Sequence, residues 1–374
     1  MKCFKSYDEF IGVFTKQILY STFAPNKGNR YMEQRTEIKD LGEFGLIDRI
    51  TKNFKPRNDS TKIGVGDDAA VIDCGNEYML LSTDMLIEGI HFDLMYMPIQ
   101  HLGYKSIAAN VSDIAAMNGI PQQVIVSIGL SNRFSVEAVE KLYEGMEAAC
   151  KDFKVDLVGG DTTSSSSGLV ISVSITGRVA KDKVALRSKA EKGDIVCATG
   201  DLGGAYIGLQ VLEREKQVFL ANPEMQPDLK KYPYIAGRQL KPRARMDIIY
   251  ELYDLNVQPK GMIDISDGLA SELFHLSTQS DVGFFIYEDK LPIDKQTYDT
   301  AVEFNIDPIT CVMNGGEDYE LLFTISQEDH EKLKKHPDIH FIGYVSEKEK
   351  GVNLVTKQQN VVPIKAQGWD HFTQ

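Results

Sequence analysis

The sequence predicts a two-domain protein of the α/β class. The chain has 374 residues, more than twice the length of a typical domain of about 150 residues. Apolar residues make up 43% of it and charged residues 25%, a balance that excludes disorder and is typical of a globular protein with a large core. Patterns of strands and helices also alternate along the chain, as they do in α/β folds.

The elements of the first half follow from apolar spacing. Residues 78–84 are an apolar run ending in polar residues, which predicts a buried strand. Residues 104–118 predict a helix built of small residues. Ser135 is placed as the N-cap of an amphipathic helix over 135–152. A turn is predicted at 159–161, and further strands are expected over 123–130 and 169–177.

The second half repeats this mixture after a charged, irregular stretch, and we expect the domain boundary near residue 181. This gives an extension of unknown role over residues 1–31, a first domain over 32–181 and a second domain over 182–374. Residues 213–234 form a polar insert that is expected to lie on the surface. Strands are expected over 194–199, 284–287 and 320–325, and helices over 203–214 and 268–279.

Charge and cysteine content exclude several functions. The 41 Lys and Arg residues against 54 Asp and Glu residues give a net charge of −13, whereas a general nucleic-acid binder needs clustered basic residues. No apolar run approaches the roughly 18 residues of a membrane span. Lys16 interrupts the apolar residues 10–23 and no small-residue cleavage site follows, so a secretory signal is not favoured. The five cysteines lie far apart without a C-x-x-C pair, which favours reduced thiols in the cytoplasm over disulfides or a zinc site.

Short acidic segments recur beside glycines or at the ends of predicted strands. A glycine next to a carboxylate lets backbone N–H groups approach a phosphate, while the acid can hold a hard cation. Crowded carboxylates repel one another unless a cation neutralises them, and Mg²⁺ prefers oxygen ligands and bridges to phosphates. The recurrence therefore predicts a metal–phosphate site. Its candidate segments are Gly64–Asp68, Ser82–Asp84, Asp113, Gly159–Asp161, Asp264–Gly268 and Gly315–Asp318.

No single segment decides the matter. An isolated Asp-Gly is usually a turn, and a Ser-Thr-Asp sequence at a strand end often caps a helix. Asp113 is a stronger candidate, because its small apolar neighbours are unlike an exposed helix face. Other catalytic signatures are missing: the sequence has no G-x-x-x-x-G-K-[ST], G-x-S-x-G or H-E-x-x-H motif. The glycines of residues 200–204 do not match the dinucleotide-binding spacing.

Taken together, these segments resemble the thiamine-monophosphate kinase family over residues 41–372. The resemblance rests on LGEFGLID, GDDAAV, STDMLIEGIHF, NVSDIAAMNG, VGGDTT, ISDGL, GGEDYELLF and GWDHF. Some of these motifs recur in a wider superfamily of ATP-dependent enzymes that includes aminoimidazole ribonucleotide synthetase and selenophosphate synthetase. The resemblance implies an N-terminal α/β domain whose strands build a β-barrel across a homodimer, followed by a C-terminal α/β domain. It also implies transfer of the γ-phosphoryl group of ATP to thiamine monophosphate.

The resemblance further implies roles for individual residues. Asp84 and Asp113 would be the catalytic ligands that bridge the metals on the two substrates, and His91, Glu317 and Trp369 would contact thiamine monophosphate. The ATP site would include Tyr143, Gly160, Asp161, Arg187 and Ser266. The ligands of several Mg²⁺ ions would be Asp68, Ser82, Thr83, Asp84, Asp113, Asp161, Asp264 and Asp267.

Two alternatives stay open at this point. The first is another ATP-dependent enzyme of the same superfamily. Against selenophosphate synthesis, no cysteine lies beside a glycine-rich N-terminal loop, since Cys74 follows the GDDAA motif. The second is a nucleotide-binding subunit that has lost its chemistry, although the complete acidic set argues against it.

Overall fold

The computed structural model describes residues 37–225 and 227–365. Residues up to Ile50 fall in a unit separate from Thr51–Trp369, and each unit is described by itself. The described part of the first unit contains the 3₁₀ turn η1 (Ile38–Asp40) and the helix α2 (Gly42–Thr51). Everything that follows concerns the second unit, which contains two β-sheets.

The first sheet has six strands in the order β1-β2-β3-β6-β4-β5. Only β4 and β5 pair in parallel; the other neighbours are antiparallel. The first and last strands do not pair with each other, so within one chain the sheet is open. The strands are β1 (Thr61–Ile63), β2 (Ala70–Asp73), β3 (Glu77–Ile87), β4 (Ile120–Leu130), β5 (Asp156–Ser164) and β6 (Leu169–Ala180).

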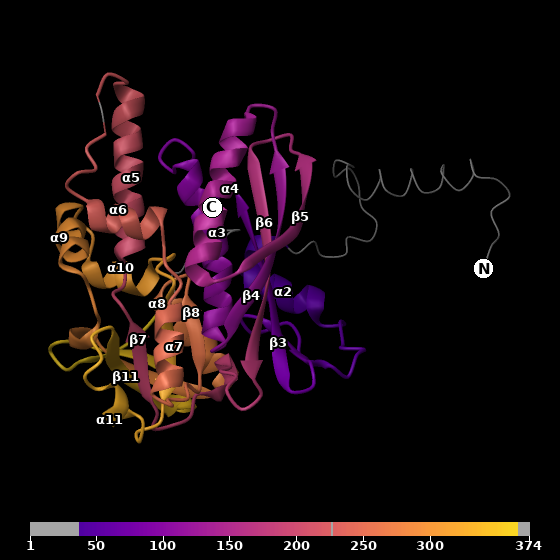
Figure 1. The fold of residues 1–374 in the computed structure, drawn as a ribbon. Helices are drawn as coiled ribbons and strands as arrows, with labels where there is room; N and C mark the ends of the chain where they lie inside the picture. The colour runs from indigo at the N-terminus through magenta and orange to yellow at the C-terminus, as the bar shows by residue number, and fades with distance from the viewer. Residues whose placement is uncertain (1–36, 226, 366–374) are drawn as a thin grey trace, which may run out of the picture. The chain divides into compact units, whose positions relative to one another are not determined.

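Helices α3 (Ile99–Ala116) and α4 (Val136–Phe153) cover one face of this sheet (Figure 1). The two helices touch at glycines: a Cβ on Gly103 would lie 2.0 Å from Leu142 O, and one on Gly145 would lie 1.8 Å from Gln100 O. The predicted N-cap is confirmed, since Ser135 Oγ accepts a hydrogen bond from Ala138 N. The helix predicted from residue 104 begins at Ile99 instead.

The turn predicted at residues 159–161 is wrong, because β5 runs straight through these residues. Two adjacent glycines weaken a strand pattern in a sequence, but here they permit close pairing with β4. A Cβ on Gly160 would lie 1.9 Å from Val126 O. The missing side chain of Gly160 is thus required by strand packing.

The second sheet has seven strands in the order β13-β12-β9-β11-β7-β10-β8. Helix α8 packs against β8 and β9, and the apolar core of this half lies between them. The strands are β7 (Ile195–Thr199), β8 (Met262–Ile265), β9 (Val282–Tyr287), β10 (Glu320–Ile325), β11 (Ile339–Glu347), β12 (Val352–Val355) and β13 (Val361–Pro363). The helices are α5 (Gly204–Ala221), α6 (Pro233–Leu240), α7 (Met246–Asp254), α8 (Leu269–Ser280), α9 (Lys295–Glu303), α10 (Pro308–Asn314) and α11 (His330–Leu333), with 3₁₀ turns η2 (Arg187–Lys189), η3 (Glu288–Lys290) and η4 (Lys348–Lys350).

Helix α5 is longer than predicted and takes up the first part of the polar insert. Lys216, within that insert, lies 2.7 Å from Asp93 Oδ2, so the helix is tied to the segment that follows β3. The insert is therefore only partly a surface excursion.

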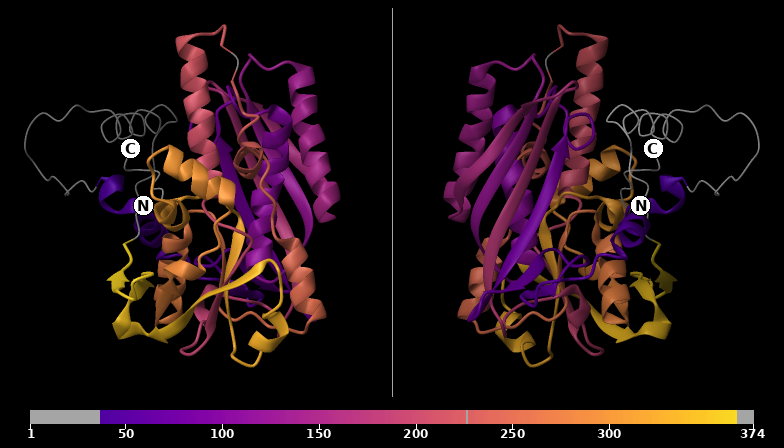
Figure 2. Two further views of the ribbon diagram at one scale, coloured as in Figure 1. Left: turned by 90° about the vertical axis from the view of Figure 1, so that its left-hand side faces the viewer. Right: turned by 90° about the vertical axis from the view of Figure 1, so that its right-hand side faces the viewer.

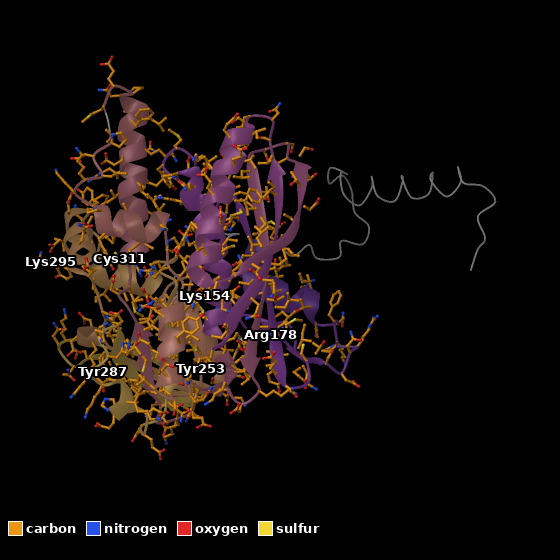
Figure 3. All side chains as sticks on the ribbon, viewed as in Figure 1. Lys154, Arg178, Tyr253, Tyr287, Lys295 and Cys311 are labelled. Carbon is orange, nitrogen blue, oxygen red and sulfur yellow. The ribbon has the colours of Figure 1, made fainter. Side chains whose placement is uncertain are left out.

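The strands of the first sheet precede residue 181 in the sequence and those of the second sheet follow it. Side chains from both halves pack into one apolar core. That core combines α3 residues such as Ile114 with Leu252 of α7 and Leu321 of β10. Tyr253, labelled in Figure 3, donates a 2.9 Å hydrogen bond to Asn118 O just after α3. Helix α3 thus lies between the two halves. Among the described residues, no helix has the length and apolarity needed to cross a membrane.

Candidate active site

Three aspartates that are far apart in the sequence lie close together in the second unit. Asp68 lies in the loop after β1, Asp113 on α3 and Asp264 on β8. One carboxylate oxygen of each lies within 4.8 Å of the others. Asp68 and Asp264 are buried, and Asp113 is partly buried. These three residues, together with Asp84, are called the acidic site below.

Hydroxyl and amide groups hold the acidic site in place. Ser82 Oγ on β3 donates a 2.6 Å hydrogen bond to Asp113 Oδ2. Ser112 Oγ on α3 donates one of the same length to Asp264 Oδ2. Asp84 is aligned through its backbone, whose N–H donates to Asn110 Oδ1 at 3.2 Å. A hydrogen bond that a charged carboxylate accepts is stronger than one between two neutral groups.

The carboxylates of the acidic site disfavour one another's charge. Burial and the charges of Asp84 and Asp264 raise the pKa of Asp113 well above its usual value. Burial and the charge of Asp68 raise the pKa of Asp264 to about 7, and burial raises the pKa of Asp84 to about 6. A bound cation reverses this balance. The donor atoms are all oxygens, which fits a hard divalent ion such as Mg²⁺.

Arg187 lies beside the acidic site and forms a bidentate ion pair with Asp68. Its Nη2 lies 2.6 Å from Asp68 Oδ1 and its Nε lies 3.1 Å from Asp68 Oδ2. Its backbone N–H donates to the carboxylate of Asp67. Burial, followed by the charge of Asp68, raises the pKa of Asp67 to about 7. A fixed guanidinium beside carboxylates is suited to binding phosphate oxygens.

Residues after β8 form a second side of the site. The backbone N–H of Asp267 donates a 3.0 Å hydrogen bond to Glu272 Oε1 on α8. Glu272 is buried, and burial followed by the charges of Asp267 and Asp264 raises its pKa well above the usual value. Ser266 O accepts a 2.7 Å hydrogen bond from Glu317 N. Ser266 and Asp267 thus follow Asp264 closely in the sequence and bond to Glu317 and Glu272, and Glu272 is an additional acid that the sequence reasoning missed.

His91 and Glu317, which the resemblance assigns to contact with thiamine monophosphate, lie on two different segments. His91 follows β3, and its Nδ1 accepts a 3.0 Å hydrogen bond from Ile87 N. Glu317 follows α10 and forms a 2.6 Å ion pair with Lys105 of α3. Trp369 lies outside the described residues, so the expectation for it stays a prediction.

Other predicted site residues are not brought to the acidic site within one chain. Thr83 points to the opposite face of the sheet from Ser82, where its Oγ1 accepts a 2.9 Å hydrogen bond from Ser174 Oγ. Gly160 and Asp161 lie on the edge strand β5, three strands away from β3. Strands are spaced by about 4.8 Å, so this separation is about 14 Å. Tyr143 lies on α4 and packs against the shared core.

Besides Glu317, the motif GGEDYELLF contains two acidic residues, Asp318 and Glu320, that bond to other elements of the fold. The Asp318 carboxylate accepts hydrogen bonds from Gly203 N at 2.6 Å and Ala205 N at 3.1 Å, at the N-terminus of α5. The glycine loop before α5 therefore holds a carboxylate of the same chain. Glu320 pairs with Arg238 and Arg245 at 2.7 Å each.

Tyr319 and Lys105 also escaped the sequence reasoning. Tyr319 is buried, and burial followed by the charges of Glu317 and Asp84 raises its pKa well above the usual value. Lys105 interrupts the same small-residue helix that made Asp113 a candidate, so the same signal could have identified it.

Comparisons with known proteins show which proteins this chain is similar to. The family described as AIR synthase related protein, N-terminal domain, matches residues 66–179. A thiamine-monophosphate kinase of Bacillus subtilis (strain 168) is 34% identical, covering 89% of this chain and 100% of that protein. One of Aquifex aeolicus (strain VF5) is 35% identical, covering 90% of this chain and 99% of that protein. A solved structure described as AaThiL complexed with AMPPCP and TMP has a TM-score of 0.77 at 32% identity, and the match covers 91% of this chain and 100% of that chain.

Proposed function

We propose that this chain, which belongs to the thiamine-monophosphate kinase family, transfers the γ-phosphoryl group of ATP to thiamine monophosphate and so produces thiamine diphosphate. The observation that carries this function is the convergence of Asp68, Asp113 and Asp264 on one point. A related structure whose description names AMPPCP and TMP as its ligands aligns over 91% of the chain. Both substrates of the proposed reaction carry phosphate groups that a cation in the acidic site would reach.

We assign Mg²⁺ as the cation of this site. Asp68, Asp84, Asp113 and Asp264 would hold it, with Ser82 and Asp267 as further ligands. The raised pKa values of Asp113, Asp264 and Asp84 support this assignment, since burial disfavours their charged forms and a bound cation would stabilise those forms. When bound, the ions neutralise phosphate charge and help to align donor with acceptor.

The residues of the chain supply positioning rather than covalent chemistry. Two polyanions must be brought into line, and alignment with charge neutralisation provides most of the barrier reduction in phosphoryl transfer. Arg187, already oriented by Asp68, would offset charge on the phosphates of ATP. A phosphate monoester is substantially deprotonated at neutral pH, so no strong base is needed. We therefore propose direct in-line attack by a thiamine monophosphate oxygen, without a phosphoenzyme.

A homodimer would complete the ATP side of the site. The face of the six-stranded sheet opposite α3 carries exposed apolar side chains, which include Met85 and Ile125, and Figure 2 (right) shows the strands of this sheet facing the viewer. The β-strand pairing places Thr83 and Asp161 on this same face. A second copy packed here would cover the apolar side chains and build a barrel from two open sheets. It would also bring Thr83 and Asp161 next to residues of the other chain.

We also place the protein in the cytoplasm. Cys74, Cys150, Cys197 and Cys311 are free thiols, as expected of a reducing compartment.

The proposed function is tested by incubating the protein with thiamine monophosphate, ATP and Mg²⁺ and detecting products by mass spectrometry. We expect thiamine diphosphate and ADP in equal amounts, and no phosphorylated product from thiamine as the control acceptor. ADP release without thiamine diphosphate would point to another ATP-dependent enzyme of the superfamily. Tight ATP binding without turnover would point to a non-catalytic subunit.

A further inference from the structure

We infer that Lys105 is a positioning residue that fixes Glu317 for binding of the acceptor substrate. The inference rests on the proposed function and on the expectation, implied by the family resemblance, that Glu317 contacts thiamine monophosphate. It concerns a lysine that lies outside the acidic site and contributes no oxygen ligand.

The Lys105 side chain is 0% exposed and its ammonium lies 2.6 Å from Glu317 Oε1. Among the described residues, Glu317 is the only carboxylate within 4.0 Å of this ammonium. A buried ammonium is strongly disfavoured unless it is paired. Burial therefore ties Lys105 to Glu317.

Helix geometry directs Lys105 toward the site. Lys105 and Ser112 are seven positions apart on α3, about two helical turns, so their side chains leave the same face of the helix. Ser112 on that face bonds to Asp264 of β8. One stripe of α3 thus holds both the acidic site, through Ser112, and the acceptor side, through Lys105.

Glu317 is held from three directions. Its backbone N–H donates to Ser266 O at 2.7 Å, its Oε1 meets Lys105, and its Oε2 accepts a 2.5 Å hydrogen bond from Gln239 Nε2. Its backbone φ of +67° is in the left-handed region that non-glycine residues rarely adopt. Such a conformation persists where the surroundings over-determine it, and it is common at ligand-binding positions.

A polar atom beside Glu317 is left for a ligand. Gln239 is 3% exposed, and its Oε1 has no hydrogen-bond partner among the described residues. Buried oxygen atoms normally accept a hydrogen bond. An N–H or O–H group of thiamine monophosphate would therefore donate to Gln239 Oε1. Lys105 and Gln239 together hold the Glu317 carboxylate in one orientation before the substrate arrives, which lowers the cost of binding.

The test measures the KM of each substrate for three variants. We expect Lys105→Met to raise the KM for thiamine monophosphate about 10-fold or more while changing the KM for ATP less than about 3-fold. Gln239→Leu should shift the same constant in the same direction by a smaller factor. Lys260→Met is the matched control, since Lys260 pairs with Asp194 and Glu191, and it should leave both constants unchanged.

A double variant separates positioning from a general structural effect. If Lys105 acts through Glu317, Lys105→Met combined with Glu317→Gln should be no worse than Glu317→Gln alone, within about 3-fold. Multiplication of the two single effects would overturn the inference, and so would equal increases in both KM values. If Lys105→Met does not fold, Gln239→Leu decides the matter, and an unchanged KM for thiamine monophosphate overturns the inference. A wild-type protein that makes no thiamine diphosphate overturns the proposed function and this inference together, whereas the other outcomes affect the inference alone.

Discussion

Ser112 on α3 donates a 2.6 Å hydrogen bond to Asp264 on β8, and this contact joins the two halves of the chain at the acidic site. The neighbouring Asp113 receives a hydrogen bond of equal length from Ser82 of β3. Adjacent residues of one helix therefore bind to two different sheets. The site depends on α3 being packed between the halves, so its geometry is set by the shared core.

Replacing Asp113 by Asn should lower kcat by at least about 100-fold, because a cation ligand that contributes about 3 kcal/mol to the transition state is lost. The fold should survive. Removal of a buried negative charge relieves repulsion with Asp84 and Asp264, so the melting temperature in EDTA should not fall. Steady-state kinetics and circular dichroism measure the two effects. Asp73→Asn on β2 is the control, and near-normal turnover of Asp113→Asn would rule out the proposed role.

The stabilising effect of Mg²⁺ should increase with pH. Without metal, Asp84 and Asp264 have folded-state pKa values of about 6 and about 7, above those of an unfolded chain. The folded state then binds more protons between about pH 4 and 7, so it loses stability as pH rises through this window. Mg²⁺ removes that loss by binding the ionised forms. Thermal melts with Mg²⁺ or EDTA at about pH 5.5 and 8 should give a larger difference at the higher pH; a difference that is constant or larger at low pH would count against the cation site.

Replacing Arg187 by Gln should raise the KM for ATP about 10- to 100-fold, since a charge-assisted hydrogen bond to a phosphate contributes about 1.5–3 kcal/mol. The KM for thiamine monophosphate should change less. Arg214→Gln is the control, because Arg214 of α5 pairs with Glu215 and Glu303. A greater effect on the acceptor than on ATP would reassign Arg187 to the other substrate.

A charge on the open face of the six-stranded sheet should dissociate the proposed homodimer. Met85→Asp places a carboxylate among apolar side chains that a second copy would bury, which costs several kcal/mol. Analytical ultracentrifugation should show a dimer for the wild type and a monomer for the variant. Leu220→Asp, a change at an exposed apolar residue of α5, should leave the dimer intact. A wild-type monomer at micromolar concentration would remove the dimer from the account.

The sequence singled out Asp113 on α3 but placed a turn where β5 runs. Asp113 stood out because a lone acid among small residues is unlike a solvent-facing helix, and its position beside the other aspartates agrees with that reasoning. The recurrence of acidic segments predicted a metal–phosphate site, and the resemblance then indicated which residues of these segments would be ligands. Gly160 shows the limit: glycines in a strand and in a turn look alike, and only the contact with Val126 distinguishes them.

Residues that act through burial were harder to foresee. A lysine in a helix is usually at the surface. The small residues around Lys105 set it apart, but they do not reveal that its side chain is fully buried. Its partner lies more than two hundred positions away, and the pairing depends on how α3 packs against the second half. The opposite faces of Ser82 and Thr83 follow from strand alternation, which the motif reasoning did not apply.

The account depends most on divalent cations binding among Asp68, Asp113 and Asp264. The direct measurement is anomalous diffraction from crystals grown with Mn²⁺, AMPPCP and thiamine monophosphate, since Mn²⁺ accepts the same oxygen ligands as Mg²⁺. We predict anomalous peaks within about 2.5 Å of carboxylate oxygens from at least two of these aspartates, between the phosphates of the two substrates. Ordered substrates with no anomalous peak at these carboxylates would contradict the account.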